Sequence, residues 1–167
     1  MESCVLKVAG NKNYYKNSGA IRRLILYVLA PGKTYWKNSR PNLKVRYSDS
    51  NYLDISNPNE AIKQIKGTKK YFGNTDGRQM YHYILSFPSK VKNPEKVYEI
   101  GLGIMDKIFY EYQAIFAVHE DTDNLHIHFV FNSVSHVTGK KWCPKNKEFQ
   151  RIKRKIISMG NSCFCDI

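Results

Sequence analysis

Two apolar stretches separated by a short polar segment constrain the fold of this chain more than any other feature. They read YQAIFAVHED and NLHIHFVFNSVSH, and the polar segment EDTDN runs from the end of the first into the start of the second. Apolar runs rich in β-branched and aromatic residues, bounded by turn-forming residues, are typical of strands. The sequence therefore predicts an antiparallel hairpin over residues 112–136.

The rest of the chain predicts helices and strands around this hairpin. The segment SGAIRRLILYVLAPGKT predicts a helix that begins after Ser18 and ends before Pro31 and Gly32. NPNEAIKQIKGTKKYFG and NPEKVYEIGLGIMDKIFY each begin with an Asn cap followed by Pro at the first helical position. We also expect a strand in CVLKVAG, a long loop over 35–56, a strand at about 80–87 and a basic helix from about 147 to 159.

The order of these elements is β-α-α-β-α-β-β-α, which does not alternate regularly. Such an order favours an α+β fold with a central antiparallel sheet and helices packed on it, over a parallel doubly wound sheet. The chain of 167 residues has no internal repeat and no low-complexity linker, so we expect one domain over residues 1–167.

Nothing in the sequence points to a membrane or to secretion. No apolar run approaches the ~18 residues that a membrane span needs, and the start MESCVLKVAG is too short and too polar for a signal peptide. The four cysteines lack the paired spacing of metal fingers, as expected of reduced thiols. We therefore expect a cytoplasmic protein without membrane insertion.

The charge of the chain indicates a polyanionic partner. Lys and Arg number 27 against 14 Asp and Glu, which gives a formal net charge of +13. An excess of this size in a small domain favours nucleic acid. Charge alone does not separate DNA from RNA or from anionic lipid.

The second strand of the hairpin carries two histidines on one face. Side chains alternate between the faces of a strand, so one face holds His126, His128, Val130 and Asn132, and the other holds Leu125, Ile127, Phe129 and Phe131. The wholly apolar face is expected to cover the core. An antiparallel return brings His119, at the end of the first strand, beside His126.

Three neutral imidazoles that converge in this way can bind a divalent metal ion and leave coordination positions open. Asp121 and Asp123 lie in the connecting turn, where one of them could orient a histidine through its second ring nitrogen. A single histidine in a strand is more often structural, but two at i and i+2 with a third opposite favour a metal site.

These motifs resemble those of a known family. HEDTDNLHIHFVFNSV resembles the histidine motif of plasmid mobilisation relaxases, the MobP-type members of the histidine-hydrophobe-histidine (HUH) endonucleases. LILYVLAPGKT resembles their nucleophile motif, a tyrosine before a short loop ending in Lys-Thr. TKKYFGNTDGRQMYHYILSFP resembles their second motif, a strand with His followed by Ser-Phe. HVTGKKW and the closing basic helix also fit, so the resemblance spans most of residues 20–160.

The sequence departs from the family pattern in two places. Ala30-Pro31 stands where the nucleophile loop usually has Asn-Pro, and Ile127 stands between the paired histidines where Asn is frequent. Neither change removes a catalytic group. Whole relaxases usually carry more chain after this domain, so the resemblance implies that further C-terminal regions are lacking here.

The resemblance implies a palm-like relaxase fold and a reaction. The reaction is metal-dependent, site- and strand-specific nicking and joining of single-stranded DNA at a transfer origin, which initiates conjugative mobilisation of a bacterial plasmid or integrative element. Tyr27 is the implied nucleophile and forms a 5′-phosphotyrosine intermediate. Mn²⁺ or Mg²⁺ is expected in use, and Zn²⁺, Co²⁺ or Ni²⁺ is chemically possible. Accessory relaxosome proteins and a coupling protein are implied partners.

Individual residues take implied roles. The metal is assigned to His119, His126 and His128, with Asp121 and His82 supporting these ligands. Contacts with DNA are assigned to Ser86, Asn132, Arg78, Lys33, Arg22 and Arg23. Ser86 as an ordinary surface serine stays equally open, and Asn132 could instead support a ligand. Tyr14, Tyr15 and Tyr35 remain rival nucleophiles.

Three other classes of protein remain open. One is a module that binds single-stranded nucleic acid with an inactive site, and another is a small metallohydrolase that uses water as the nucleophile. The third is a replication-initiator or transposase nuclease of the same superfamily. In those nucleases the tyrosine usually follows the histidines, whereas Tyr27 precedes them, so the order favours a relaxase.

Overall fold

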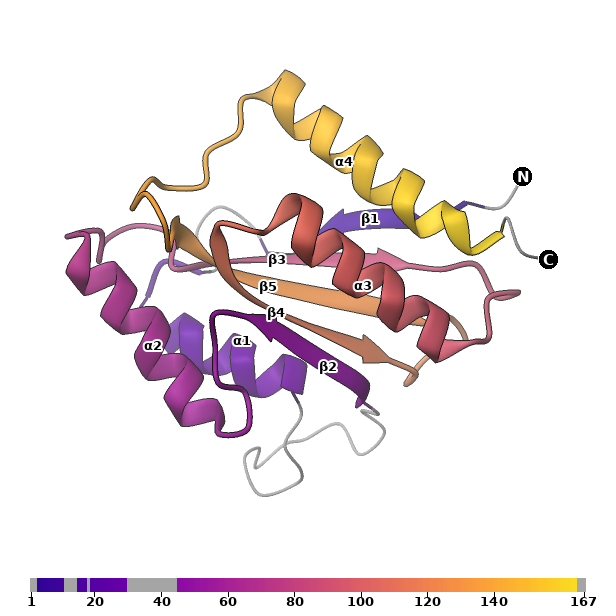
Figure 1. Ribbon diagram of the computed structural model, residues 1–167, viewed down its shortest axis with the longest axis horizontal. Coiled ribbons are helices and arrows are strands. Elements are labelled where there is room, and N and C mark those ends of the chain that lie inside the picture. The colour runs from indigo at the N-terminus through magenta and orange to yellow at the C-terminus, as the bar shows by residue number, and fades with distance from the viewer. Residues whose placement is uncertain (1–2, 11–14, 18, 30–44, 165–167) are drawn as a thin grey trace.

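The predicted antiparallel sheet with packed helices is confirmed. The computed structural model describes residues 3–10, 15–17, 19–29 and 45–164. Its five-stranded sheet has the order β1-β3-β5-β4-β2, and every pairing is antiparallel (Figure 1). The strands are β1 (Val5–Val8), β2 (Val45–Asn51), β3 (Met80–Ser86), β4 (Tyr112–His119) and β5 (His126–Ser135). The helices are α1 (Gly19–Leu29), α2 (Pro58–Tyr71), α3 (Pro94–Ile108) and α4 (Asn146–Asn161), and a 3₁₀ turn η2 (Ser162–Phe164) follows.

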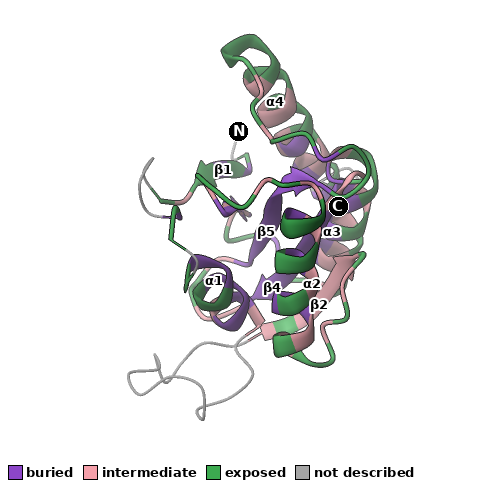
Figure 2. Cartoon of the chain, turned by 90° about the vertical axis from the view of Figure 1, so that its left-hand side faces the viewer, coloured by how far each residue is buried: buried purple, intermediate pink, exposed green. Residues whose placement is uncertain are grey.

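The sheet is covered by helices on both faces, so the protein has two cores. Helices α3 and α4 pack on the face that carries Ile127, Phe129 and Phe131. Helices α1 and α2 pack on the other face, around Val130. Strands β4 and β5 lie buried between these layers (Figure 2). The apolar face of β5 covers a core as expected, but its histidine-bearing face is buried as well.

Asparagine side chains start α2 and α3 as the sequence predicts. The side chain of Asn57 accepts a hydrogen bond from the backbone N–H of Asn59, and Pro58 begins the helix. The side chain of Asn93 accepts hydrogen bonds from the backbone N–H groups of Glu95 and Lys96. These bonds satisfy backbone donors that have no partner within the first turn of a helix.

Helix α3 lies very close to β4. Val97 and Ile104 of α3 are fully buried, whereas Ile100 and Ile108 are half-buried. The close approach is made at Gly101, where an added Cβ would lie 2.3 Å from the Phe116 ring. A glycine at this position lets the helix and the strand approach this closely.

The prediction of one long loop over residues 35–56 is wrong for its second half. Residues 45–51 form β2, an edge strand that pairs with β4. Its sequence VRYSDSN is polar and has no regular alternation, and its residues are mostly half-buried. An edge strand needs only one neighbour, so the pairing with β4 fixes β2 although its own pattern is weak. No helix within the part of the chain that the structure describes is long and apolar enough to cross a membrane.

Candidate metal centre and its tyrosine

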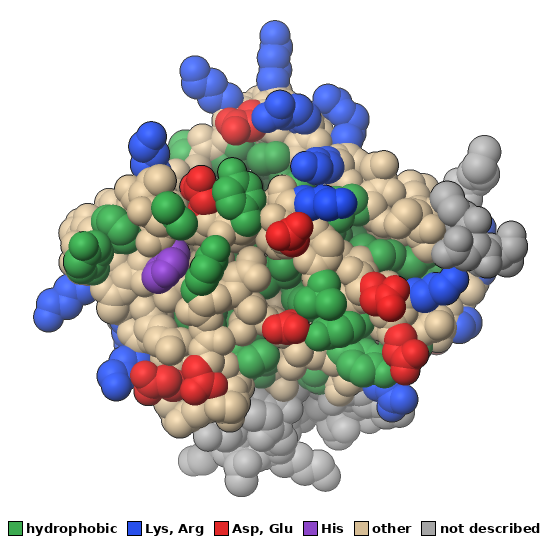
Figure 3. Space-filling model, viewed as in Figure 1, with side chains coloured by type: hydrophobic (Ala, Val, Ile, Leu, Met, Phe, Trp, Pro, Cys, Tyr) green, Lys and Arg blue, Asp and Glu red, His purple; other side chains and the backbone are tan. Residues whose placement is uncertain are grey.

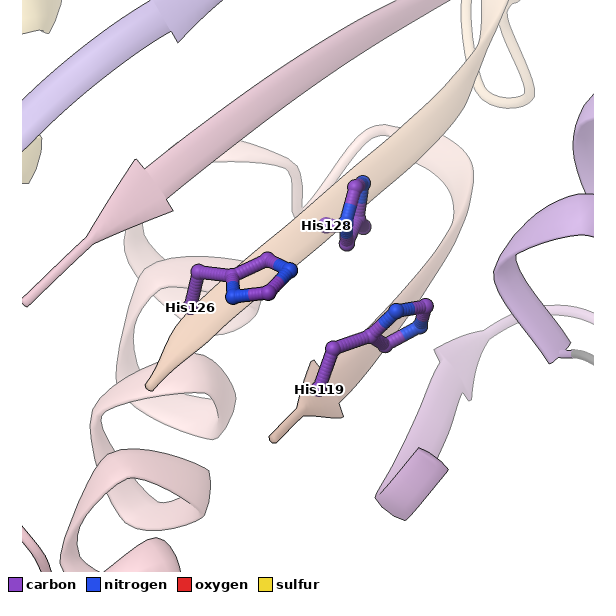
Figure 4. A group of neighbouring side chains, drawn as sticks. All are labelled: His119, His126 and His128. Carbon is purple, nitrogen blue, oxygen red and sulfur yellow. The ribbon is translucent and has the colours of Figure 1, made fainter. Parts of the chain in front are cut away.

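The hairpin β4–β5 brings the three predicted histidines together. His119 pairs directly with His126, and His128 lies two residues further along the same face of β5. Each ring offers a nitrogen, and these three nitrogens lie within 4.8 Å of one another. All three imidazoles point into one space beside the hairpin (Figure 4). This separation is compatible with coordination of a single ion.

Each imidazole is held from outside the cluster by one ring nitrogen. His119 Nε2 lies 2.9 Å from the carbonyl of Val28, and His126 Nδ1 lies 3.1 Å from the carbonyl of Asn124. A carbonyl only accepts, so these nitrogens carry the hydrogen. His128 Nδ1 lies 2.7 Å from Nε2 of His82. The remaining nitrogens, His119 Nδ1, His126 Nε2 and His128 Nε2, are then the candidate metal ligands.

The local polar atoms fit a cation between the rings. His119 Nδ1 and Asp121 Oδ1 are the two buried side-chain polar atoms without a hydrogen-bond partner in the part of the chain that the structure describes. Asp121 Oδ1 lies 3.9 Å from His119 Nδ1 and 3.4 Å from His126 Nε2. Buried polar atoms without partners are rare in folded proteins. A divalent cation would satisfy both atoms, and nitrogen and carboxylate donors suit such an ion.

The expected position of the aspartate needs a correction. The sequence places Asp121 and Asp123 where one of them could orient a histidine through its second ring nitrogen, away from the metal. Backbone carbonyls take that role at His119 and His126, and the Asp121 carboxylate instead approaches the nitrogens that face the cluster. Asp123 is exposed. Asp121 therefore adds negative charge at the edge of the candidate metal site.

Burial favours the neutral form of His119, His128 and His82. It lowers the pKa of His119 and of His128 below the usual value, and the other imidazoles of the cluster lower the pKa of His128 further. Burial also lowers the pKa of His82 to about 4, with a contribution from His119. A neutral imidazole has a free lone pair, which is the form that binds metal.

Tyr27 lies over the cluster. Its ring centroid is 5.5 Å from that of His128, 6.1 Å from that of His82 and 6.5 Å from that of His119. Leu24, Ile25 and Val28 are buried in the core beneath α1, which fixes the direction of the helix (Figure 2). The residue predicted as the nucleophile is thus next to the residues predicted to hold the metal.

The rival tyrosines are placed differently or not described. Tyr14 and Tyr35 lie outside the described residues, as does Lys33. Tyr15 is 5% exposed, and its hydroxyl lies 3.2 Å from Nδ1 of His82. Tyr15 therefore lies behind His82, whose other nitrogen contacts the metal-ligand candidate His128.

Four of the predicted DNA contacts lie in three different places. Ser86 is half-buried and pairs with His126 across β3 and β5, so it lies beside the cluster. Arg22 and Arg23 are exposed on α1 and donate hydrogen bonds to Asn59 and Asn17, respectively. Arg78 is half-buried, with its guanidinium carbon 4.7 Å from the centre of the Tyr81 ring.

Asn132 does not fit its predicted DNA contact. It is 0% exposed, its amide nitrogen donates to Gln113 Oε1 at 3.1 Å, and its amide oxygen accepts from the backbone N–H of Val134. The side chain is held inside the sheet because helices cover both faces of β5. The structure gives Asn132 a role in joining β4 to β5.

Basic side chains lie on both faces of the molecule. On the face opposite α1, Lys and Arg gather over α4 (Figure 3), and they are Lys147, Arg151, Lys153, Arg154 and Lys155. On the other face, Arg22 and Arg23 lie on α1, the helix that carries Tyr27. The net charge of the chain therefore does not indicate which of the two faces binds DNA.

The fold and the site define an α+β domain that holds a tyrosine over three buried histidines. Residues 33–158 match the family model for the relaxase nuclease domain of the MobA/VirD2-like type. The match covers more than half of the chain. The chain belongs to the MobA/VirD2-like relaxase family.

Two curated relatives illustrate the similarity. The chain is 34% identical over 94 residues to protein Rlx of Staphylococcus aureus, a region that covers 56% of this chain and 28% of that protein. It is 29% identical over 178 aligned positions to the group II intron-interrupted relaxase LtrB of Lactococcus lactis subsp. cremoris (strain MG1363), which covers 85% of this chain and 31% of LtrB. The matched region thus spans less than a third of each relative.

The fold is also similar to a solved structure described as "Molecular Basis of Vancomycin Resistance Transfer in Staphylococcus aureus". The TM-score is 0.53 at 10% sequence identity, over 74% of this chain and 71% of that one. At this identity the likeness supports the α+β fold alone.

Proposed function

We propose that this chain is a nuclease domain that nicks and rejoins one DNA strand at a transfer origin, with Tyr27 as the nucleophile. The observation that carries the proposal is the 5.5 Å separation between the ring centroids of Tyr27 and His128. It brings a phenol to a cluster that can hold a cation. The domain would act on single-stranded DNA in the bacterial cytoplasm, together with accessory proteins and a coupling protein.

The proposed reaction exchanges one phosphodiester for another. The Tyr27 oxygen attacks the scissile phosphorus, loses its proton to a base, and forms a 5′-phosphotyrosine. The bond to the 3′ oxygen breaks, and that oxygen takes up a proton to become a free 3′-hydroxyl. The number of phosphoester bonds stays the same, so the 3′-hydroxyl can reverse the step and rejoin the strand.

The residues of the site support this chemistry in distinct ways. We assign His119, His126 and His128 to hold the divalent ion, Mn²⁺ or Mg²⁺ in use, although Zn²⁺, Co²⁺ and Ni²⁺ also suit imidazole ligands. When bound, the ion supplies positive charge for the developing charge on the non-bridging oxygens. A phenol has an ordinary pKa of about 10 and needs a proton acceptor at neutral pH.

DNA would approach from the side of α1 and the exposed end of β3. We assign Ser86 to the strand near the scissile phosphate, because it pairs with His126 at the open end of the cluster. Arg22, Arg23, Arg78 and Lys33 are assigned to other phosphates. Single-stranded DNA is the expected substrate because the backbone must enter beside a tyrosine held on a packed helix.

The deciding experiment is the detection of a covalent adduct. The chain is incubated with Mn²⁺ and single-stranded oligonucleotides that tile the transfer origin of the element encoding it, and the products are separated under denaturing conditions. We expect a protein–DNA band for wild type and for Tyr71→Phe, since Tyr71 is 83% exposed on α2, and no band for Tyr27→Phe. Peptide mapping should place the DNA on Tyr27.

The other outcomes identify the alternatives. Attachment at Tyr14, Tyr15 or Tyr35 would mean that another tyrosine is the nucleophile. Cleavage without an adduct would indicate a hydrolase that uses water. Binding of the oligonucleotides without cleavage would indicate a binding module.

A further inference from the structure

Tyr15, His82 and His128 form a buried chain of polar contacts that ends at the candidate metal centre. The Tyr15 hydroxyl lies 3.2 Å from His82 Nδ1, and His82 Nε2 lies 2.7 Å from His128 Nδ1. The three side chains are 5%, 4% and 2% exposed. Both nitrogens of His82 are therefore engaged by protein groups.

The position of Tyr15 is fixed by the fold. Its backbone carbonyl accepts a hydrogen bond of 2.7 Å from the N–H of Gln79, directly before β3. Its ring belongs to the core that includes Ile21 and Ile25 of α1. Tyr15 thus joins the segment before α1 to the strand that carries His82.

The two hydrogen bonds that link Tyr15, His82 and His128 can both run in either of two directions. Only one of these directions allows His128 to bind a metal through Nε2. A neutral imidazole carries one N–H. If His128 Nε2 is to offer its lone pair, the hydrogen lies on His128 Nδ1 and is donated to His82 Nε2. The single hydrogen of His82 then lies on Nδ1 and is donated to the Tyr15 oxygen.

The opposite direction blocks the site. If the Tyr15 hydroxyl donates to His82 Nδ1, the hydrogen of His82 lies on Nε2 and is donated to His128 Nδ1. The hydrogen of His128 is then left on Nε2, the nitrogen that faces the cluster. This direction keeps both the Tyr15–His82 and the His82–His128 hydrogen bonds but removes one metal ligand.

We propose that Tyr15 is a positioning residue whose phenol oxygen accepts the Nδ1 hydrogen of His82 and thereby keeps His128 in the tautomer that binds metal. The proposal rests on the metal centre of the proposed function. Without the phenol oxygen, the metal-binding direction leaves a buried N–H of His82 unpaired, whereas the opposite direction leaves only a lone pair unpaired. Buried N–H groups without acceptors are the rarer and more costly of the two.

The two tyrosines near His82 therefore have different roles. Tyr27 lies over the cluster, with its ring 6.1 Å from the His82 ring. Tyr15 contacts the nitrogen of His82 that points away from His128. Loss of the Tyr27 hydroxyl is expected to remove the nucleophile, and loss of the Tyr15 hydroxyl is expected to weaken the metal site.

The first test combines metal affinity with the tautomer of His82. Titration calorimetry of the full chain with Mn²⁺ should show an affinity about 10- to 100-fold lower for Tyr15→Phe, the range typical for loss of a group that supports a metal ligand. Tyr47→Phe is the control, because its hydroxyl bonds to Glu95 on the other side of the sheet. Long-range ¹H–¹⁵N spectra should show the Nδ1–H form of His82 in Zn²⁺-loaded wild type and the Nε2–H form in metal-free Tyr15→Phe.

A double-mutant cycle separates this role from general stability. In His82→Glu, a carboxylate can accept the His128 hydrogen without help from Tyr15, so adding Tyr15→Phe should lower Mn²⁺ affinity no further. If Tyr15→Phe lowers the Mn²⁺ affinity equally with and without His82→Glu, the proposal is overturned. The Nδ1–H form of His82 in metal-free Tyr15→Phe would overturn it as well. A chain that shows the Tyr15-dependent affinity but forms no DNA adduct would contradict the proposed function and still support this role.

Discussion

His119 in β4 is joined to Val28 in α1 by a hydrogen bond of 2.9 Å from its Nε2 atom to the backbone carbonyl. Val28 lies in the last turn of α1, where backbone carbonyls have no partner within the helix. It is also the residue after Tyr27. A histidine of the candidate metal centre therefore completes the end of the helix that carries the candidate nucleophile, so the positions of the two groups depend on each other.

Metal binding should stabilise the protein through the three histidines. At an Mn²⁺ concentration of 100 times Kd, a ligand that binds only the folded state adds about 2.7 kcal/mol to the free energy of unfolding. We expect a rise in Tm for wild type and for His136→Ala, since His136 is exposed and outside the cluster. His126→Ala should show no rise. The Tm values are measured by calorimetry. If Mn²⁺ raises the Tm of His126→Ala as much as that of wild type, His126 is not a metal ligand.

A buried lysine should make the stability of the protein depend on alkaline pH. Lys69 is 2% exposed and its Nζ donates to Ser133 Oγ, and burial together with Lys141 lowers its pKa to about 8. Between pH 8 and the unfolded value of 10.5, the unfolded chain keeps a proton that the folded chain has lost, so stability rises with pH. Below pH 8 the buried charge lowers stability by up to about 3 kcal/mol.

Lys69→Met should therefore unfold at a higher denaturant concentration than wild type at pH 7, and the difference should shrink towards pH 10.5. Lys70→Met is the matched control, because Lys70 is the exposed next residue of α2. The denaturant concentration at which Lys70→Met unfolds should differ little from that of wild type, and this difference should not depend on pH. A constant difference for Lys69→Met across this range would show that Lys69 titrates normally.

Two glycines in helices should respond in opposite ways to the same substitution. An Ala side chain at Gly101 would collide with the Phe116 ring, and overpacking of this kind typically lowers stability by about 1–3 kcal/mol. At Gly67 in α2 a Cβ would meet nothing within 4 Å, so Gly67→Ala should raise stability by about 0.5–1 kcal/mol. Chemical denaturation measures both. Equal effects would mean that α3 does not pack on β4 as closely as described.

Binding of single-stranded DNA should depend on salt through the arginines of α1. Each phosphate contact contributes about 0.7 to the slope of log affinity against log salt. Arg23 lies one turn before Tyr27 on the same side of α1, whereas Arg154 lies on α4 across the sheet. We expect Arg23→Gln to reduce the slope by about 0.7 and Arg154→Gln to leave it unchanged. The reverse result, obtained by fluorescence anisotropy, would place the DNA on the α4 face.

The hairpin and its histidines could be predicted because the signals are local. Strand alternation alone places His126 and His128 on one face, and a short turn places His119 opposite them. The caps at Asn57 and Asn93 are local signals as well. Strand β2 has no such signal, because an edge strand with one neighbour does not require an alternating apolar pattern.

The features of the site that the sequence does not indicate depend on contacts between distant segments. The sequence assigns Asn132 to a DNA contact or to the support of a ligand, but the residue is buried because α1 and α2 cover the histidine-bearing face. The contact between Tyr15 and His82 joins residues 67 positions apart, and no local pattern indicates it. The carbonyl of Val28 carries no side-chain signal at all. Tyr27 was identified through the family resemblance, since its spacing on α1 is also that of a packing residue.

The distances along the chain between these groups give the site an order of assembly. His119 and His126 close a loop within one hairpin, whereas the bond from His119 to Val28 joins residues 91 positions apart. The entropy lost on closing a loop grows with its length, and contacts between distant segments slow folding. We therefore expect a refolding chain to regain metal binding before it regains nicking, because the hairpin can gather its imidazoles while the helix with Tyr27 is still undocked.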